Sequence, residues 1–110
     1  MKRYVLALDL VDNEILIREY EEYHRAVWPE ITKSILDAGI QNMEIYRFGN
    51  RLCMIMEVND DFEFSKKAEM DNSNLKVQEW EKVMWKYQQS IPGAKEGEKW
   101  VLMDKIFQLV

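Results

Sequence analysis

Apolar residues alternate with other residues along three segments of the chain, the period-two pattern of β-strands. Residues 3–11 form the first and place Tyr4, Leu6, Leu8 and Leu10 on one face. Residues 51–58 repeat the pattern with Leu52, Met54, Met56 and Val58. Residues 40–48 form another strand, which the Gly49-Asn50 turn joins to the one that follows.

Helical spacing governs the segment between the first two strands. Its apolar residues recur every three or four positions and form one stripe: Leu16, Tyr20, Tyr23 and Val27. Asp12-Asn13 supplies a turn or an N-cap before this helix. Pro29 interrupts this helix and favours the start of a second helix. Gly39 ends the second helix.

The second half of the chain follows the same plan. Asp60-Asp61 is predicted to cap a helix that runs to about residue 70, and residues 71–74 interrupt it. A longer helix is predicted over residues 75–90 and is ended by Pro92-Gly93. The last strand is predicted over residues 100–109.

The predicted order is βαββαβ with each helix broken, which indicates one domain over residues 1–110. Its fold class is α+β: a ferredoxin-like sandwich with a four-stranded antiparallel sheet and helices on one face. The first and third strands are apolar on both faces, and helices cover only one. We therefore predict a homodimer in which two sheets pack face to face.

The composition limits the cellular compartment and the classes of partner that the protein can have. A net charge of -5 argues against a nucleic-acid surface, which needs a basic patch. The single cysteine, Cys53, forms no internal disulfide and fits a cytoplasmic protein. The apolar N-terminal run is short and carries Asp9, so it reads as a strand and not a signal peptide. No segment is long enough to cross a membrane.

The residues from Arg18 to Glu30 hold the most distinctive chemistry. His24 is the only histidine of the chain, with Tyr20 one helical turn before it and Trp28-Pro29 four residues after it. Histidine exchanges protons near neutral pH, so His24 is the candidate acid–base group among aromatic rings that hold an organic ligand. The alternative is a structural or merely exposed histidine.

Other kinds of centre lack the residues they need. Zinc takes three or four Cys, His or carboxylate ligands, but this chain has one His and one Cys. There is no glycine-rich phosphate loop and no nucleophile motif. We expect neither metal nor cofactor. Core packing is the more common role for a tryptophan, but Trp80 lies beside Glu79, Glu81 and Lys82, which tilts it towards a polar-lined pocket.

The residues of the first helix resemble a known family. Residues 19–30, with Tyr20, His24 and Trp28-Pro29-Glu30, are similar to the first-helix motif of the L-rhamnose mutarotases. Looser likenesses extend over nearly the whole chain, at residues 39–42, 45–46, 56–58, 80, 85–87 and 103–107. The resemblance implies a dimeric α/β barrel that interconverts sugar anomers without a cofactor.

The resemblance also assigns residues. It implies that His24 is the proton donor and that Tyr20 binds substrate. Met43 stands where relatives often have a binding tyrosine, and Trp80-Glu81 with Trp85 stands where they have paired tryptophans. The expected substrate-binding residues are Tyr20, Trp80, Trp85, Tyr46 and Met43. The sugar stays open between L-rhamnose, L-fucose and related deoxysugars.

Two other functions fit the same pattern. A small dimeric-barrel monooxygenase or haem-degrading protein would use His24 as a haem ligand. A non-catalytic module of this fold would bind a sugar or a protein partner without accelerating anomer exchange. A bound chromophore would distinguish the first from a mutarotase, and an unchanged exchange rate would distinguish the second.

Overall fold

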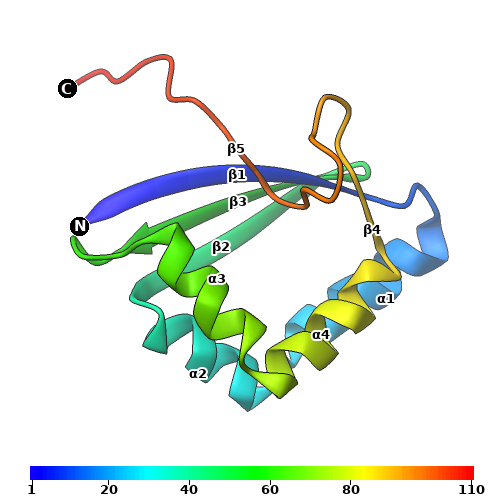
Figure 1. The fold of residues 1–110 in the computed structure, drawn as a ribbon. Coiled ribbons are helices and arrows are strands. Elements are labelled where there is room, and N and C mark those ends of the chain that lie inside the picture. Colours follow the sequence, from blue (N-terminus) through cyan, green and yellow to red (C-terminus); the bar gives the residue numbers. More distant parts are fainter.

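An antiparallel sheet forms one layer of the computed structural model, which describes residues 1–110, and helices form the other layer (Figure 1). The strands are β1 (Lys2–Leu10), β2 (Ile40–Phe48), β3 (Arg51–Val58), β4 (Gln88–Gln89) and β5 (Val101–Leu102). The helices are α1 (Glu14–Arg25), α2 (Pro29–Asp37), α3 (Phe64–Asn72) and α4 (Leu75–Trp85). No helix is long and apolar enough to span a membrane.

The sheet has the order β2-β3-β1-β4, and β5 pairs with another part of β1. All neighbours are antiparallel. The four helices lie on one side of the sheet (Figure 1). This arrangement confirms the predicted ferredoxin-like α+β fold with helices on one face.

The core forms where the alternating strands face the helices. Along β3 every second residue is buried, and the buried set is the predicted one: Leu52, Met54, Met56 and Val58. The leucines of β1 pair with it in register, Leu6 opposite Met54 and Leu8 opposite Leu52. Each such side chain removed from water stabilises the fold by about 1.5–3 kcal/mol, so alternation alone decides which face packs on the helices.

The helix starts follow local chemistry in α1, α2 and α4. The Asn13 side-chain oxygen accepts hydrogen bonds from two backbone amides of α1, as predicted, and Asn74 does the same for α4. Pro29 begins α2. The predicted cap of α3 by Asp60-Asp61 is wrong, because α3 starts at Phe64. Asp60 instead binds the N-terminal ammonium, which lowers the pKa of its carboxyl group.

Helix α4 ends five residues earlier than predicted, at Trp85 rather than near residue 90. The following residues turn back to β1. The Val11 amide donates to the Tyr87 carbonyl at 2.8 Å, and the Tyr87 hydroxyl donates to Glu19 Oε1 at 3.0 Å. Burial and the Glu19 carboxylate raise the pKa of Tyr87 to about 12, so its hydroxyl stays a donor. These long-range bonds outweigh the helical propensity of the segment and create β4.

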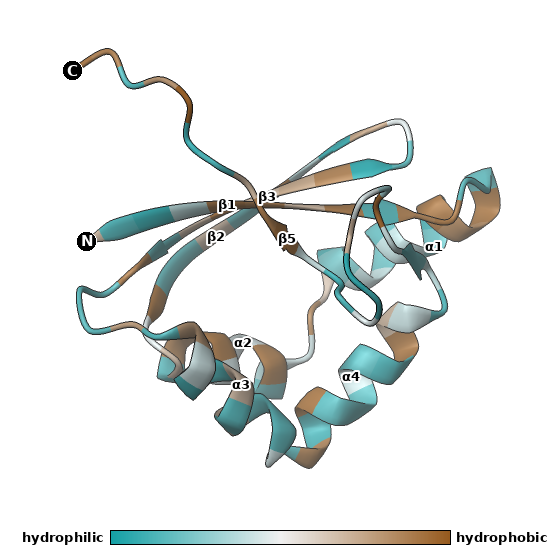
Figure 2. Ribbon diagram, turned by 45° about the horizontal axis from the view of Figure 1, so that its top comes forward, coloured by the Kyte–Doolittle hydropathy of each residue, from teal (hydrophilic) through white to brown (hydrophobic).

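The last strand is also shorter than the predicted residues 100–109. β5 covers only Val101–Leu102, and the Met103 amide makes one more bond to the Val5 carbonyl. The remaining residues, 103–110, leave the sheet on the side opposite the helices (Figure 1). We call them the C-terminal arm. Figure 2 shows both hydrophobic and hydrophilic stretches along this arm, and its Ile106 and Val110 side chains are almost fully exposed.

Candidate functional site

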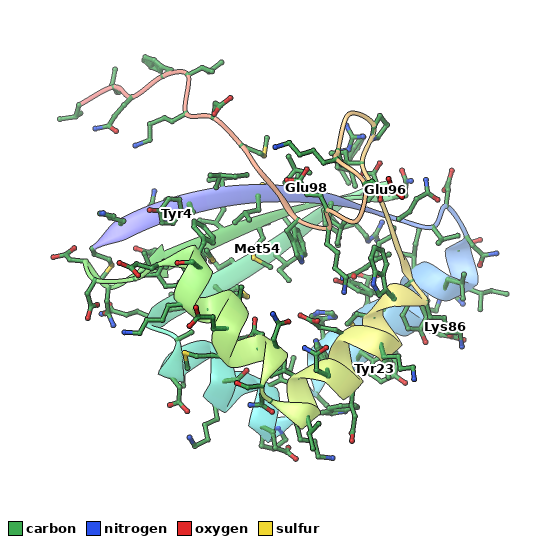
Figure 3. All side chains as sticks on the ribbon, in the orientation of Figure 1. Tyr4, Tyr23, Met54, Lys86, Glu96 and Glu98 are labelled. Carbon is green, nitrogen blue, oxygen red and sulfur yellow. The ribbon has the colours of Figure 1, made fainter.

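A largely apolar cavity of about 330 Å³ lies between the sheet and the helices. Met43 of β2 and Met54 of β3 line its sheet side, and Figure 3 shows Met54 among the side chains that fill this layer. Tyr20 of α1 and Trp80 of α4 line its helix side. The cavity therefore combines residues from both halves of the chain around the aromatic groups of α1 and α4.

His24 stands beside the cavity, and one hydrogen bond orients its ring. Its Nδ1 lies 2.9 Å from the Tyr20 carbonyl oxygen. A carbonyl oxygen only accepts, so Nδ1 carries the hydrogen and the neutral ring keeps a free lone pair on Nε2. The ring centroid lies 4.4 Å from that of Tyr20 and 5.7 Å from that of Trp80. His24 is thus oriented to accept a proton through Nε2.

Tyr20 is buried, with its hydroxyl next to the Gln88 side chain. Gln88 Nε2 donates to that hydroxyl at 3.4 Å. Burial raises the pKa of Tyr20, and the bond from Gln88 opposes the shift only in part. The hydroxyl therefore keeps its proton at neutral pH and is available as a hydrogen-bond donor to a ligand.

Trp80 belongs to the core and lines the cavity at the same time. Its ring packs edge-on against Tyr23, His24 and Trp28, with centroids 6.0, 5.7 and 5.1 Å away. Only 9% of its surface is exposed. Core packing and ligand contact, which are alternatives when only the sequence is considered, are combined in the structure: the Trp80 ring belongs to the core cluster and also lines the cavity.

The structure brings some of the predicted site residues together and leaves others apart. Tyr20, Trp80 and Met43 line the cavity, and His24 contacts two of them from its edge while lining two neighbouring hollows. Tyr46 lies on the opposite face of β2, 56% exposed. Trp85 is 43% exposed outside the cavity. Our proposal for the site leaves both out.

Several other lining residues were not predicted from the sequence, among them Gln88, Lys99 and Trp100. Gln88 was assigned to a helix, and Trp100 to a strand without a site role. Lys99 followed a polar loop, and its ammonium lies 4.4 Å over the Trp85 ring. Burial lowers the pKa of Lys99, and the Glu81 carboxylate opposes that shift. No local signal marks these residues, because β1 pairing alone brings residues 86–102 to the cavity.

Comparison with known proteins shows the family of this chain. The family model described as L-rhamnose mutarotase matches residues 3–109. The chain belongs to the L-rhamnose mutarotase family. It is a mutarotase, an isomerase that interconverts the anomers of a deoxysugar. An L-fucose mutarotase of Xanthomonas campestris pv. campestris is 43% identical over 111 residues, covering 99% of this chain and 89% of that protein.

Solved structures show the same fold at low sequence identity. An L-rhamnose mutarotase from Formosa agariphila has a TM-score of 0.74 at 19% identity, with both chains fully covered. Tetracenomycin F2 cyclase of Streptomyces glaucescens follows with 0.62 at 17%, covering 100% of this chain and 98% of that one. A dimeric ferredoxin-like protein from an uncultured marine organism reaches 0.55 at 14%, covering 96% and 90%. Since a cyclase shares this fold, the fold alone does not select the reaction.

Proposed function

We propose that this mutarotase opens and recloses the ring of L-fucose or L-rhamnose, with His24 as its principal acid–base group. One observation carries the proposal. The bond between His24 Nδ1 and the Tyr20 carbonyl leaves Nε2 free beside a cavity that Tyr20 and Trp80 line. A single group that both takes and returns a proton suits a reaction whose substrate and product differ only at the anomeric carbon.

The reaction needs only proton transfers and a bond rotation. Removing the proton of the anomeric hydroxyl forms the C1 carbonyl, while the C1–ring-oxygen bond breaks and the ring oxygen takes up a proton. Rotation about C1–C2 and the reverse steps give the other anomer. His24 Nε2 accepts or returns a proton. The Tyr20 hydroxyl, kept protonated by burial, donates a hydrogen bond that positions the sugar.

The apolar lining supports a deoxysugar. Both candidate sugars carry a C6 methyl group in place of a hydroxymethyl group, and Met43, Met54 and Ile35 offer it an apolar wall. Burying a hydroxyl there without a partner is unfavourable. The relative from Xanthomonas is named for L-fucose and the family for L-rhamnose, so both are proposed.

Magnetisation-exchange NMR measures the anomer interconversion directly and tests this proposal. We expect faster exchange of L-fucose or L-rhamnose with protein than without it. L-Galactose and L-mannose are the matched controls, because each differs from one candidate only by the C6 hydroxyl, and they should be exchanged more slowly. Equal acceleration of all four sugars would contradict the role of the apolar wall, and no acceleration would contradict the proposed function.

We also propose that two copies pack through their helix-free sheet faces. Val5 and Ile55 pair directly across this face, as do Ala7 and Cys53, and three of the four are half-buried in one copy. The C-terminal arm leaves on the same side, with Ile106 96% exposed. Figure 3 shows the arm's side chains projecting away from the rest of the chain. A second copy would cover both surfaces, and one structural neighbour is named as dimeric.

Light scattering at micromolar concentration is expected to give twice the mass of the chain. Ile106→Glu should weaken this dimer, because it replaces an apolar side chain of the arm with a carboxylate that the interface would bury. Ile15→Glu is the matched control, because Ile15 is 65% exposed on α1, away from the proposed interface. A monomeric wild type would contradict the dimer, and equal effects of the two variants would contradict the involvement of the arm.

Anomer exchange is expected to be independent of metal ions. The proposed steps are proton transfers at His24, and no group of three His, Cys, Asp or Glu residues comes together as a ligand set. Prolonged dialysis against a chelator should leave the exchange rate unchanged. Loss of activity that zinc or magnesium restores would overturn the prediction.

A further inference from the structure

Gln88 carries the one buried side-chain oxygen or nitrogen atom without a hydrogen-bond partner in this structure, its Oε1. The residue is 8% exposed and lines the cavity. Buried amide oxygens nearly always have a partner, because leaving one unpaired is destabilising. A buried, unpaired acceptor in the wall of a binding cavity therefore indicates that a ligand completes it.

The other end of the same amide is already engaged. Gln88 Nε2 donates to the Tyr20 hydroxyl, so that hydroxyl keeps its own proton free to donate elsewhere. A free acceptor and a free donor thus belong to two residues that contact each other and both line the cavity. A sugar hydroxyl both donates and accepts, and it satisfies the two together. Pairing of Gln88 with Leu10 of β1 holds the acceptor in place.

The remaining polar groups of the cavity are less suited to reading a neutral hydroxyl. Ser34 Oγ donates to a backbone carbonyl of its own helix, and Lys67 and Asp71 bind each other. Lys99 and Glu81 are charged and half-exposed, so water also solvates them. The Gln88 amide oxygen is the buried, uncharged acceptor with unused capacity.

We propose that Gln88 determines which sugar this enzyme accepts, through a hydrogen bond from one ring hydroxyl to its Oε1. The proposal rests on the proposed function and names the residue that selects within it. L-Fucose and L-rhamnose share the C6 methyl group and differ in the orientation of the C2 and C4 hydroxyls. An apolar wall does not distinguish them, whereas a fixed acceptor is met by one orientation and left unpaired by the other.

A chemical double-mutant cycle tests the contact. The wild type and Gln88→Leu are assayed by anomer exchange on the preferred sugar of L-fucose and L-rhamnose, and on its 2-deoxy, 3-deoxy and 4-deoxy analogues. Gln89→Leu is the matched control, since Gln89 is the exposed neighbour in the same strand. Thermal melts establish that each variant is folded, and Gln88→Met, of similar length, replaces Gln88→Leu if that variant does not fold.

One analogue is expected to lose about 10- to 100-fold in kcat/KM with the wild type, the range of a lost hydrogen bond that leaves its partner unpaired. On the parent sugar, Gln88→Leu should lose about as much kcat/KM as the wild type loses on that analogue. Removing the hydroxyl should then cause no further loss with Gln88→Leu, because the hydrogen bond is already absent. The ratio of kcat/KM values for L-fucose and L-rhamnose should therefore be closer to one for Gln88→Leu than for the wild type. Gln89→Leu should match the wild type throughout.

Equal losses by Gln88→Leu on the parent and on every analogue would overturn the proposal, because the residue would then act through Tyr20 or the fold. If the wild type accelerates no sugar, the proposed function fails separately. In that case, saturation-difference NMR measures the dissociation constants of the same sugars for the wild type and Gln88→Leu, and these values replace kcat/KM in the cycle. Coupling between Gln88 and one hydroxyl would still support the contact, and absence of coupling or of binding would overturn it.

Discussion

Replacing His24 with alanine or asparagine is expected to slow anomer exchange by about two orders of magnitude or more. The His24 Nδ1 is bonded to the Tyr20 carbonyl, which leaves the lone pair on Nε2 free, and both variants remove this basic nitrogen. The fold should survive, because His24 is half-exposed. Exchange NMR on the preferred sugar measures the rate, and thermal melts measure the stability.

Tyr20→Phe is the companion variant to His24→Asn. It keeps the buried ring that packs against His24 and removes the hydroxyl that accepts from Gln88. A smaller loss than for His24→Asn is expected if the hydroxyl only positions the sugar, and a similar loss if it transfers the second proton. A His24 variant that is folded and nearly fully active would return His24 to a structural role.

Replacing Trp80 with alanine is expected to lower the free energy of unfolding by about 3–5 kcal/mol, the cost of emptying a large buried aromatic site. Trp80 is 9% exposed and lies at the centre of a cluster with Tyr23, His24 and Trp28. Sugar affinity should fall as well, because the same ring lines the cavity. Denaturant titration and sugar titration measure the two effects separately.

Trp85→Ala is the matched control for Trp80. The two tryptophans share α4, but Trp85 is 43% exposed and outside the cavity. Its removal should cost little stability and leave sugar binding intact. If Trp85→Ala loses sugar binding while Trp80→Ala loses only stability, the assignment of Trp80 to the cavity is wrong.

Local patterns in the sequence determined the parts of the fold whose partners are near neighbours. Alternation in β3 sorted core from helix-free face correctly, because side chains of a strand point to opposite sides whatever the strand pairs with. In β1 the alternate leucines are also core residues, but all of residues 6–10 are buried there. Asn13 and Pro29 marked helix starts through their own side chains. The contact between Tyr20 and His24 follows from helical spacing alone.

The candidate acid–base group was therefore predictable from one helix, while its surroundings were not. The contacts that Trp80 makes with His24 and Trp28 join α4 to α1 and to the start of α2, far apart in sequence. The sequence pattern within α4 does not indicate which of its two tryptophans contacts His24 and Trp28. Trp80 and Trp85 differ in burial only because α4 packs one of its sides on the rest of the chain.

Tertiary structure alone decided where the secondary-structure elements in the second half of the chain begin and end. The segment after Trp85 is compatible with helix, but bonds to Val11 and Glu19 turn it into β4. The predicted last strand keeps only Val101–Leu102, because those residues are the ones that find a partner on β1. The unpaired oxygen of Gln88 arises in the same way. Hydrogen-bond satisfaction depends on which groups surround an atom in space, and its sequence neighbours do not specify them.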